Sequence, residues 1–185
     1  MRKTPLKSSG IESQALLAEI LAAFPPTPYP GDRMLSDCWC EECAWSVRNL
    51  RGKSWKQAQL EDFNLGDGGR VSTDAFGYYL PAMLTLAIRH PDETHLACEI
   101  NSRFVTFIES RDNEIETIQQ TVSRLSKPQR TTLVHFFQWL RNQDWQSPLL
   151  IDAAINAVND NCIEPISANA IWESVRAKEA KTKPL

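Results

Sequence analysis

Three of the five cysteines lie within six residues, in the segment Ser36-Asp37-Cys38-Trp39-Cys40-Glu41-Glu42-Cys43. Thiolates are good zinc ligands, and closely spaced thiols also carry out redox chemistry. If a helix begins near Glu41, Cys40 and Cys43 face the same side, and Cys38 can fold back from the preceding loop. The spacing therefore predicts a zinc site at Cys38, Cys40 and Cys43. The candidates for a fourth ligand are His90, His95, Cys98, Cys162 and Asp37.

Two other interpretations of this segment stay open. A complete zinc module has two pairs of ligands, and the second pair is absent from the sequence. Cys40 or Cys43 can instead be a small buried hydrophobic residue, and we favour this packing interpretation. Thiol redox chemistry is the third interpretation and the least favoured. The neighbouring glutamates would raise the pKa of a thiol and weaken it as a nucleophile. A nucleophilic pair of Cys98 with His95 has no supporting signature, and we predict no catalytic residue.

Aromatic residues around the same segment suggest contact with a partner protein. The chain has six tryptophans, and tryptophan and tyrosine are frequent where proteins bind each other. Trp39 stands among acidic residues and Tyr29 among prolines. The predicted partner-binding residues are Tyr29, Asp37, Trp39, Glu41 and Glu42. For Tyr29 the alternative is a packed residue that supports the proline-rich loop.

The elements that position these residues are predicted to be helices. Apolar residues recur at helical spacing over 9–24, and Ser9 with Glu12 has the spacing of a capping box. A stiff loop with four prolines covers 25–31, and a short helix over 41–50 ends at Gly52. Further helical segments are predicted over 54–63, 72–89 with Pro81 inside, 114–125, 126–140, 149–158 and 167–179, and residues 104–108 have strand composition.

These elements predict a mostly α fold: a single compact multi-helix domain with a proline-rich loop and at most a short strand or hairpin. The expected domain covers 9–178, with a flexible tail over 1–8 and a loose tail over 179–185. Hydrophobic residues make up 42% of the chain and charged residues 23%, which is ordinary globular usage.

Composition also excludes several classes of partner. The formal net charge of −3 argues against a general nucleic-acid binder, which usually carries a basic surface. No run of apolar residues is long enough to span a membrane. The basic N-terminus is not followed by an apolar core, so we expect no secretory signal, reduced cysteines and a cytoplasmic location.

Three stretches of the chain resemble an uncharacterised bacterial family, a domain of unknown function. They are Phe24 to Asp32 (Phe-Pro-x-x-Pro-Tyr-Pro-Gly-Asp), Arg51 to Trp55 (Arg-Gly-Lys-x-Trp) and Ala75 to Leu84, which contains Tyr-Tyr-Leu-Pro-Ala. A weaker similarity lies around Leu125 to Leu140, so that the resemblance covers the first 90 residues well and the remainder weakly. It implies a bacterial, cytoplasmic protein and supplies no activity.

Two functions follow from these observations. The first is a bacterial protein-interaction module, most plausibly an immunity protein or regulator that neutralises a partner such as a basic toxin, because an acidic surface speeds encounter with a basic one. The alternative is a zinc-binding or thiol-dependent protein centred on Cys38, Cys40 and Cys43, with or without an enzymatic activity. We expect a non-enzymatic role and no cofactor, zinc being the one exception.

Overall fold

The computed structural model describes residues 10–36, 40, 41, 44, 47–63, 71–108, 113–143, 147–160 and 163–182. Within these ranges the chain is mostly helical and contains no strand, which confirms the predicted mostly α class. It forms two compact units. We call Leu17–Ala97 the N-terminal unit, and Cys98–Leu185 together with Met1–Leu16 the C-terminal unit. The predicted domain boundaries at residues 8 and 178 stay a prediction.

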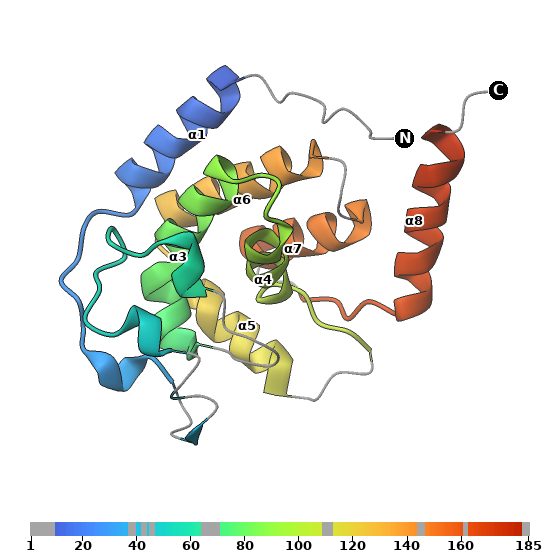
Figure 1. Ribbon diagram of the computed structural model, residues 1–185. Helices are drawn as coiled ribbons and strands as arrows, with labels where there is room; N and C mark the ends of the chain where they lie inside the picture. The colour runs from blue at the N-terminus through green and yellow to red at the C-terminus, as the bar shows by residue number, and fades with distance from the viewer. Residues whose placement is uncertain are drawn as a thin grey trace. The chain divides into compact units, whose positions relative to one another are not determined.

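The helices follow the predicted segments (Figure 1), except that α4 covers 94–102, where no helix was predicted because the apolar pattern over 96–108 is ambiguous. The α-helices are α1 Gly10–Ala23, α3 Thr73–Arg89, α4 Thr94–Ser102, α5 Asn113–Ser123, α6 Lys127–Arg141, α7 Pro148–Asp160 and α8 Ala168–Thr182. Three short 3₁₀ helices are η1 Asp32–Met34, η2 Arg48–Leu50 and η3 Leu60–Phe63. In the predicted short helix over 41–50, Glu41 and Ala44 have helical backbone. The predicted capping serine of α1, Ser9, lies outside the described residues.

Helix α3 belongs to the N-terminal unit, and its sequence is apolar on almost every side. Phe76, Tyr79 and Leu80 have no exposed surface, as expected for a helix of this composition. The Ser72 side chain caps the helix by accepting a hydrogen bond from the Ala75 amide at 3.0 Å. The Ser72 hydroxyl also donates to the Met34 carbonyl, which ties the start of α3 to the segment around η1.

The proline-rich loop has no regular secondary structure over 25–31, as predicted. It ends at Gly31, whose φ of 104° places it in a region that suits glycine. Gly52 has φ 69° and closes the turn after η2, which confirms the predicted left-handed glycine.

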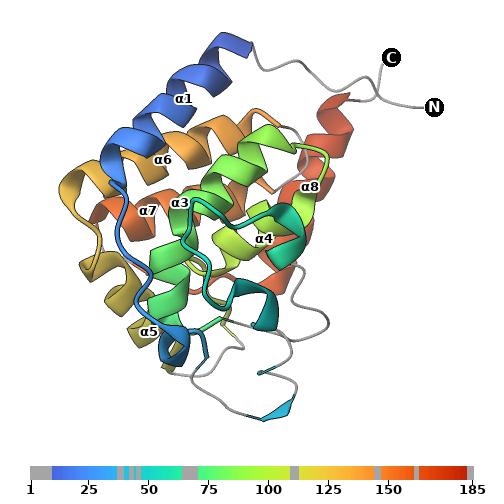
Figure 2. The ribbon, with the colours of Figure 1, turned by 60° about the vertical axis from the view of Figure 1, so that its left-hand side comes forward.

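In the C-terminal unit, α6 and α7 form the main packing pair. They run side by side in both views (Figures 1 and 2), and α5 and α8 also contact α7. Ser126 and Gln129 form a capping box at the start of α6. The apolar face of α6 is buried: Leu133, Phe136, Phe137 and Leu140. Phe104 packs edge-to-face on Phe137 with ring centroids 5.7 Å apart, so the segment after α4 is anchored to this core.

The strand-like run over 104–108 forms one isolated parallel bridge, between Phe107 and Ile166. The Ile166 amide donates to the Thr106 carbonyl at 3.0 Å, and the Ile108 amide donates to the Ile166 carbonyl at 3.1 Å. A single short pairing cannot build a sheet, which is why the run stays a bridge. No helix in the described ranges is long and apolar enough to cross a membrane.

Candidate functional site

Of the five predicted partner-binding residues, the structure describes Tyr29 and Glu41. Glu41 is exposed, as a binding residue must be. Asp37, Trp39 and Glu42 lie outside the described residues. The predicted surface therefore stays a prediction, with Glu41 in an accessible position.

Tyr29 is half-buried and makes contacts within its own unit. Its hydroxyl donates to Asp32 Oδ1 at 2.5 Å, and its ring packs edge-to-face against Tyr78 with centroids 6.2 Å apart. Burial raises the pKa of the Tyr29 hydroxyl to about 12, and the hydrogen bond to Asp32 acts in the same direction. These contacts fit the interpretation of Tyr29 as a packed support for the proline-rich loop.

The predicted zinc ligands fall largely outside the described part of the chain. Cys38 and Cys43 are not described, whereas Cys40 is exposed, so the packing interpretation does not hold for Cys40. Cys98 is also exposed, as are His90 and His95. Among the described residues, no three histidine, cysteine, aspartate or glutamate side chains come together in a way that could hold a metal ion. The zinc hypothesis stays a prediction because two of its three thiols are not described.

The three stretches that carry the sequence resemblance contact one another in the N-terminal unit. Tyr78, in the third stretch, contacts the other two. Its hydroxyl donates to the Thr27 carbonyl at 3.3 Å and accepts from the Trp55 amide at 3.4 Å. Asp32 Oδ1 accepts from the Gly52 amide at 3.3 Å in addition to Tyr29. The proline-rich loop, the turn at Gly52 and α3 are therefore joined by polar contacts.

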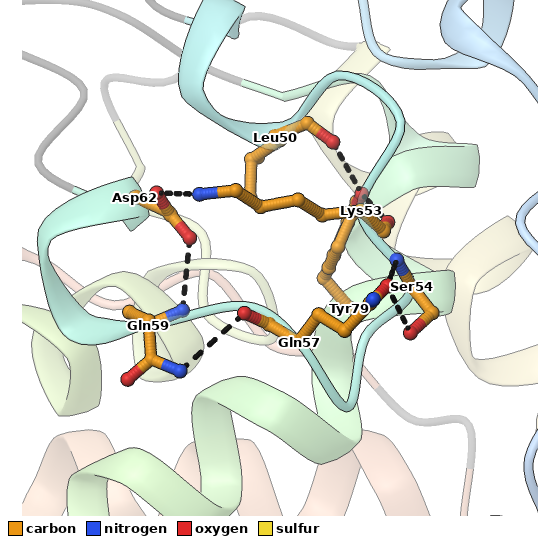
Figure 3. Close-up of polar contacts among 7 residues, drawn as sticks. All are labelled: Leu50, Lys53, Ser54, Gln57, Gln59, Asp62 and Tyr79. Carbon is orange, nitrogen blue, oxygen red and sulfur yellow. Dashed lines mark hydrogen bonds and ion pairs between the residues drawn. The ribbon is translucent and has the colours of Figure 1, made fainter.

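A second part of this network surrounds a buried carboxylate (Figure 3). Lys53 Nζ lies 2.6 Å from Asp62 Oδ1, and Asp62 Oδ2 accepts from the Gln59 amide at 2.9 Å. The Tyr79 hydroxyl lies 2.8 Å from the Lys53 carbonyl and 3.0 Å from the Leu50 carbonyl, so its single proton is shared between them. Burial raises the pKa of Tyr79 and keeps this hydroxyl protonated as a donor. Each polar group here has an internal partner, which is the arrangement of a structural brace.

A groove in the C-terminal unit is the site that sequence reasoning missed. One wall is a face of α7 made by Leu149, Asp152, Ala153 and Asn156. The second wall is formed by residues 164–167 and Ala170, and Ile108 completes the lining. The volume is about 600 Å³, within the range of pockets that hold ligands. The only signal in the sequence is the helical spacing of the four α7 residues.

Local structure explains how the second wall is held. The bridge to residues 106–108 fixes Ile166 on both sides, through its amide and its carbonyl. One residue later, the Ser167 side chain accepts from the Ala170 amide at 3.2 Å and so caps α8. In Figure 1 the yellow-green segment after α4 and the orange-red segment before α8 run together toward α8.

Large apolar side chains are exposed on the same unit. Ile108 is 62% exposed and Phe107 is 37% exposed, and Trp172 of α8 is 63% exposed. Single exposed hydrophobic residues are common on protein surfaces. Ile108 differs from Phe107 and Trp172 because it also lines the groove.

The groove carries negative charge. Asp152 and Glu164 line it, and none of the described lining residues is basic. Asp152 Oδ2 lies 2.9 Å from Arg141 Nη2, so one of the two carboxylates is already neutralised by a neighbouring cation. Glu164 is exposed and contributes the second carboxylate.

Part of the chain matches a protein family whose function is unknown. Residues 70–159 match the family of unknown function DUF6714, which agrees with the recognition of an uncharacterised domain family. The match includes the Tyr-Tyr-Leu-Pro-Ala motif and the segment around 125–140, and it begins after the other two motifs. No curated protein and no solved structure matches the chain.

Proposed function

We propose that this chain, which contains a domain of unknown function, is a protein-interaction module. The observation that carries the proposal is the exposure of Ile108 at the edge of a groove, with Phe107 beside it in sequence and Trp172 exposed on the same unit. Exposing such side chains to water is unfavourable by about 25 cal/mol per Å² of apolar area. A partner that covers them recovers this free energy on binding.

The partner that best suits the chain is a basic protein in the bacterial cytoplasm. The net charge is −3, and the groove and Glu41 both present carboxylates. Complementary charge raises the rate of encounter and disfavours acidic competitors. A regulator or immunity protein that blocks a basic toxin has these properties, and we propose this as the finer version of the function.

Two surfaces can serve this function. One is the predicted segment from Tyr29 to Glu42, of which Glu41 is accessible, and the other is the groove with Ile108. Tyr29, Tyr78 and Tyr79 use their hydroxyls inside the N-terminal unit. At the groove, Ile108, Asn156 and Glu164 are exposed, and this difference favours the groove.

Affinity capture with paired variants tests the proposal. We expect the tagged wild-type chain to retain a host protein in near-stoichiometric amount, and the variant Ile108→Asp to lose it. The matched control is Leu21→Asp, because Leu21 is also an exposed aliphatic residue (53%) but belongs to the N-terminal unit. Retention of no stoichiometric protein by the wild type would contradict the proposed function.

The finer version is tested by co-expression. The protein encoded next to this chain is expressed in a sensitive host, with and without the wild-type chain. We expect the neighbour to slow growth when expressed alone and the chain to restore it. A neighbour that is harmless alone would remove the support for an immunity role while leaving the interaction proposal in place.

A further inference from the structure

The hollow in the C-terminal unit results from two small side chains that stand where larger residues would fill the space. Ala153 of α7 and Ala170 of α8 both line the groove, and both are only partly buried. The opposite face of α7 is well packed, with Ile151, Ala154 and Val158 buried. The helix is therefore held firmly from behind, and the space above Ala153 is open to an incoming side chain.

The walls around this space are apolar in part. Leu149 and Ile166 provide aliphatic surface and Pro165 provides a rigid ring. Ile108 remains mostly in water. A bulky apolar side chain that enters the groove would contact these residues and be removed from water, which favours binding.

Polar groups at the groove indicate which kind of partner residue would lie next to that apolar side chain. Glu164 is exposed, and Asp152 shares its charge with Arg141. Because Arg141 balances Asp152, the exposed carboxylate of Glu164 leaves the described lining with an excess of negative charge, which attracts a cation. Asn156 adds an amide that can donate to and accept from a peptide backbone.

The open shape suits a chain segment better than a small molecule. Sites for small ligands bury most of the ligand surface, whereas Ile108, Asn156 and Glu164 are exposed around this groove. An extended peptide can place one side chain in the hollow and leave its flanks in solvent.

We infer that this groove binds a segment of a partner protein in which a bulky apolar residue (Leu, Ile, Met or Phe) is adjacent to Lys or Arg. The apolar side chain occupies the space above Ala153 and Ala170, and the cation lies near Glu164. This inference rests on the proposed interaction function and adds the chemistry of the segment that is recognised.

Selection from a phage-displayed library of random peptides tests the inference. The full chain is the target, and the variant Ala153→Trp is the counter-target, because a large ring at this position fills the hollow. The control is Ala177→Trp, which places the same ring on an exposed position of α8 outside the groove. Circular dichroism of all three proteins establishes that the helices are intact.

We expect enriched peptides to pair an apolar residue with Lys or Arg, and to bind Ala153→Trp at least about tenfold more weakly than Ala177→Trp. Glu164→Lys should weaken the same peptides by about fivefold at most, as for an exposed ion pair. Glu173→Lys, an exposed carboxylate of α8 outside the lining, should leave binding unchanged.

Three results would overturn the inference: no enrichment over the counter-target, enriched peptides without a cation, or equal binding to both tryptophan variants. Sedimentation of the unliganded chain adds a fourth, because a dimer that Ala153→Trp dissociates would show that a second copy occupies the groove. Capture of a host protein by Ala153→Trp as efficiently as by the wild type rejects the groove but keeps the interaction function. Absence of any captured protein rejects the function itself.

Discussion

The hydroxyl of Tyr79 should be a larger contributor to stability than the hydroxyl of its neighbour Tyr78. The variants Tyr79→Phe and Tyr78→Phe form a matched pair, because each removes one oxygen and keeps an aromatic ring. Tyr79 is completely buried, and its hydroxyl is 2.8 and 3.0 Å from two carbonyl oxygens. Tyr78 is half-buried, and its contacts are longer, at 3.3 and 3.4 Å.

The loss of unfolding free energy in Tyr79→Phe depends on which hydrogen bonds the Leu50 and Lys53 carbonyls lose. The Leu50 carbonyl also accepts from the Lys53 amide at 3.2 Å, so it keeps a donor in Tyr79→Phe. The Lys53 carbonyl loses the tyrosine proton, and an unsatisfied buried acceptor costs about 1–3 kcal/mol. Partial exposure of this carbonyl reduces the cost, so we expect Tyr79→Phe to lower the free energy of unfolding by about 1–2 kcal/mol. The melting temperature should fall by about 3–6 °C.

For Tyr78→Phe the expected cost is below about 0.5 kcal/mol, because an O–H···O distance of 3.3 Å exceeds the usual range and water can replace the contact. The assay is urea unfolding of both variants and the wild type, followed by far-ultraviolet circular dichroism. Equal losses for the two variants, or a larger loss for Tyr78→Phe, would refute the assignment of Tyr79 as the buried donor that links the Lys53 turn to α3.

Three further predictions concern titration, capping and metal. Burial and the bond to Asp32 raise the pKa of Tyr29 from 10.0 to about 12 in the folded chain. Its stabilising contribution is therefore complete below about pH 10 and is lost as pH rises through about 12. Tyr29→Phe should make the alkaline fall in unfolding free energy shallower, and an unchanged slope would argue against the part-buried, hydrogen-bonded position of this hydroxyl. Ser126→Ala should cost about 1 kcal/mol by removing the α6 capping box, with Ser123→Ala near zero as the control in the same urea assay. The zinc hypothesis predicts about one zinc per chain purified without chelator, reduced in Cys40→Ser, and a metal content far below one by elemental analysis rejects it.

Local signals in the sequence were sufficient to predict most helices of the described chain. Ser126 and Gln129 lie three residues apart and satisfy each other's backbone donors, and Ser72 caps α3 in the same way. These interactions involve neighbours in sequence, so their residue types and spacing define them before any tertiary contact forms. Gly52 was predictable for a similar reason, because glycine accepts a positive φ at low cost.

The acceptors of the Tyr79 hydroxyl could not be predicted. They are main-chain carbonyls, which every residue carries, so no residue type identifies them. Tyr78 and Tyr79 are adjacent on one helix, and helical geometry alone could not choose which of the two faces inward. The distances to the Leu50 and Lys53 carbonyls identify Tyr79.

The groove was also beyond sequence reasoning, because its two walls come from segments that are joined only through the fold. Ala153 and Ala170 are ordinary helix-forming residues in the sequence, and they become informative only when both line the same space. The cysteine segment shows the opposite case. Its spacing is evident in the sequence, but the chemistry of a thiol depends on the groups that surround it in space.

Under the proposed function, the two walls of the groove should contribute differently to partner choice. Residues 70–159 include the α7 wall, with Leu149 and Ala153, and they end before the wall that carries Glu164. An apolar hollow on a helix face accepts many side chains, since one methylene changes binding by only about 1 kcal/mol. A carboxylate at its rim discriminates by charge, which disfavours an acidic partner more strongly. Affinity for an apolar residue should therefore depend on α7, and selection of a basic partner on the segment that precedes α8.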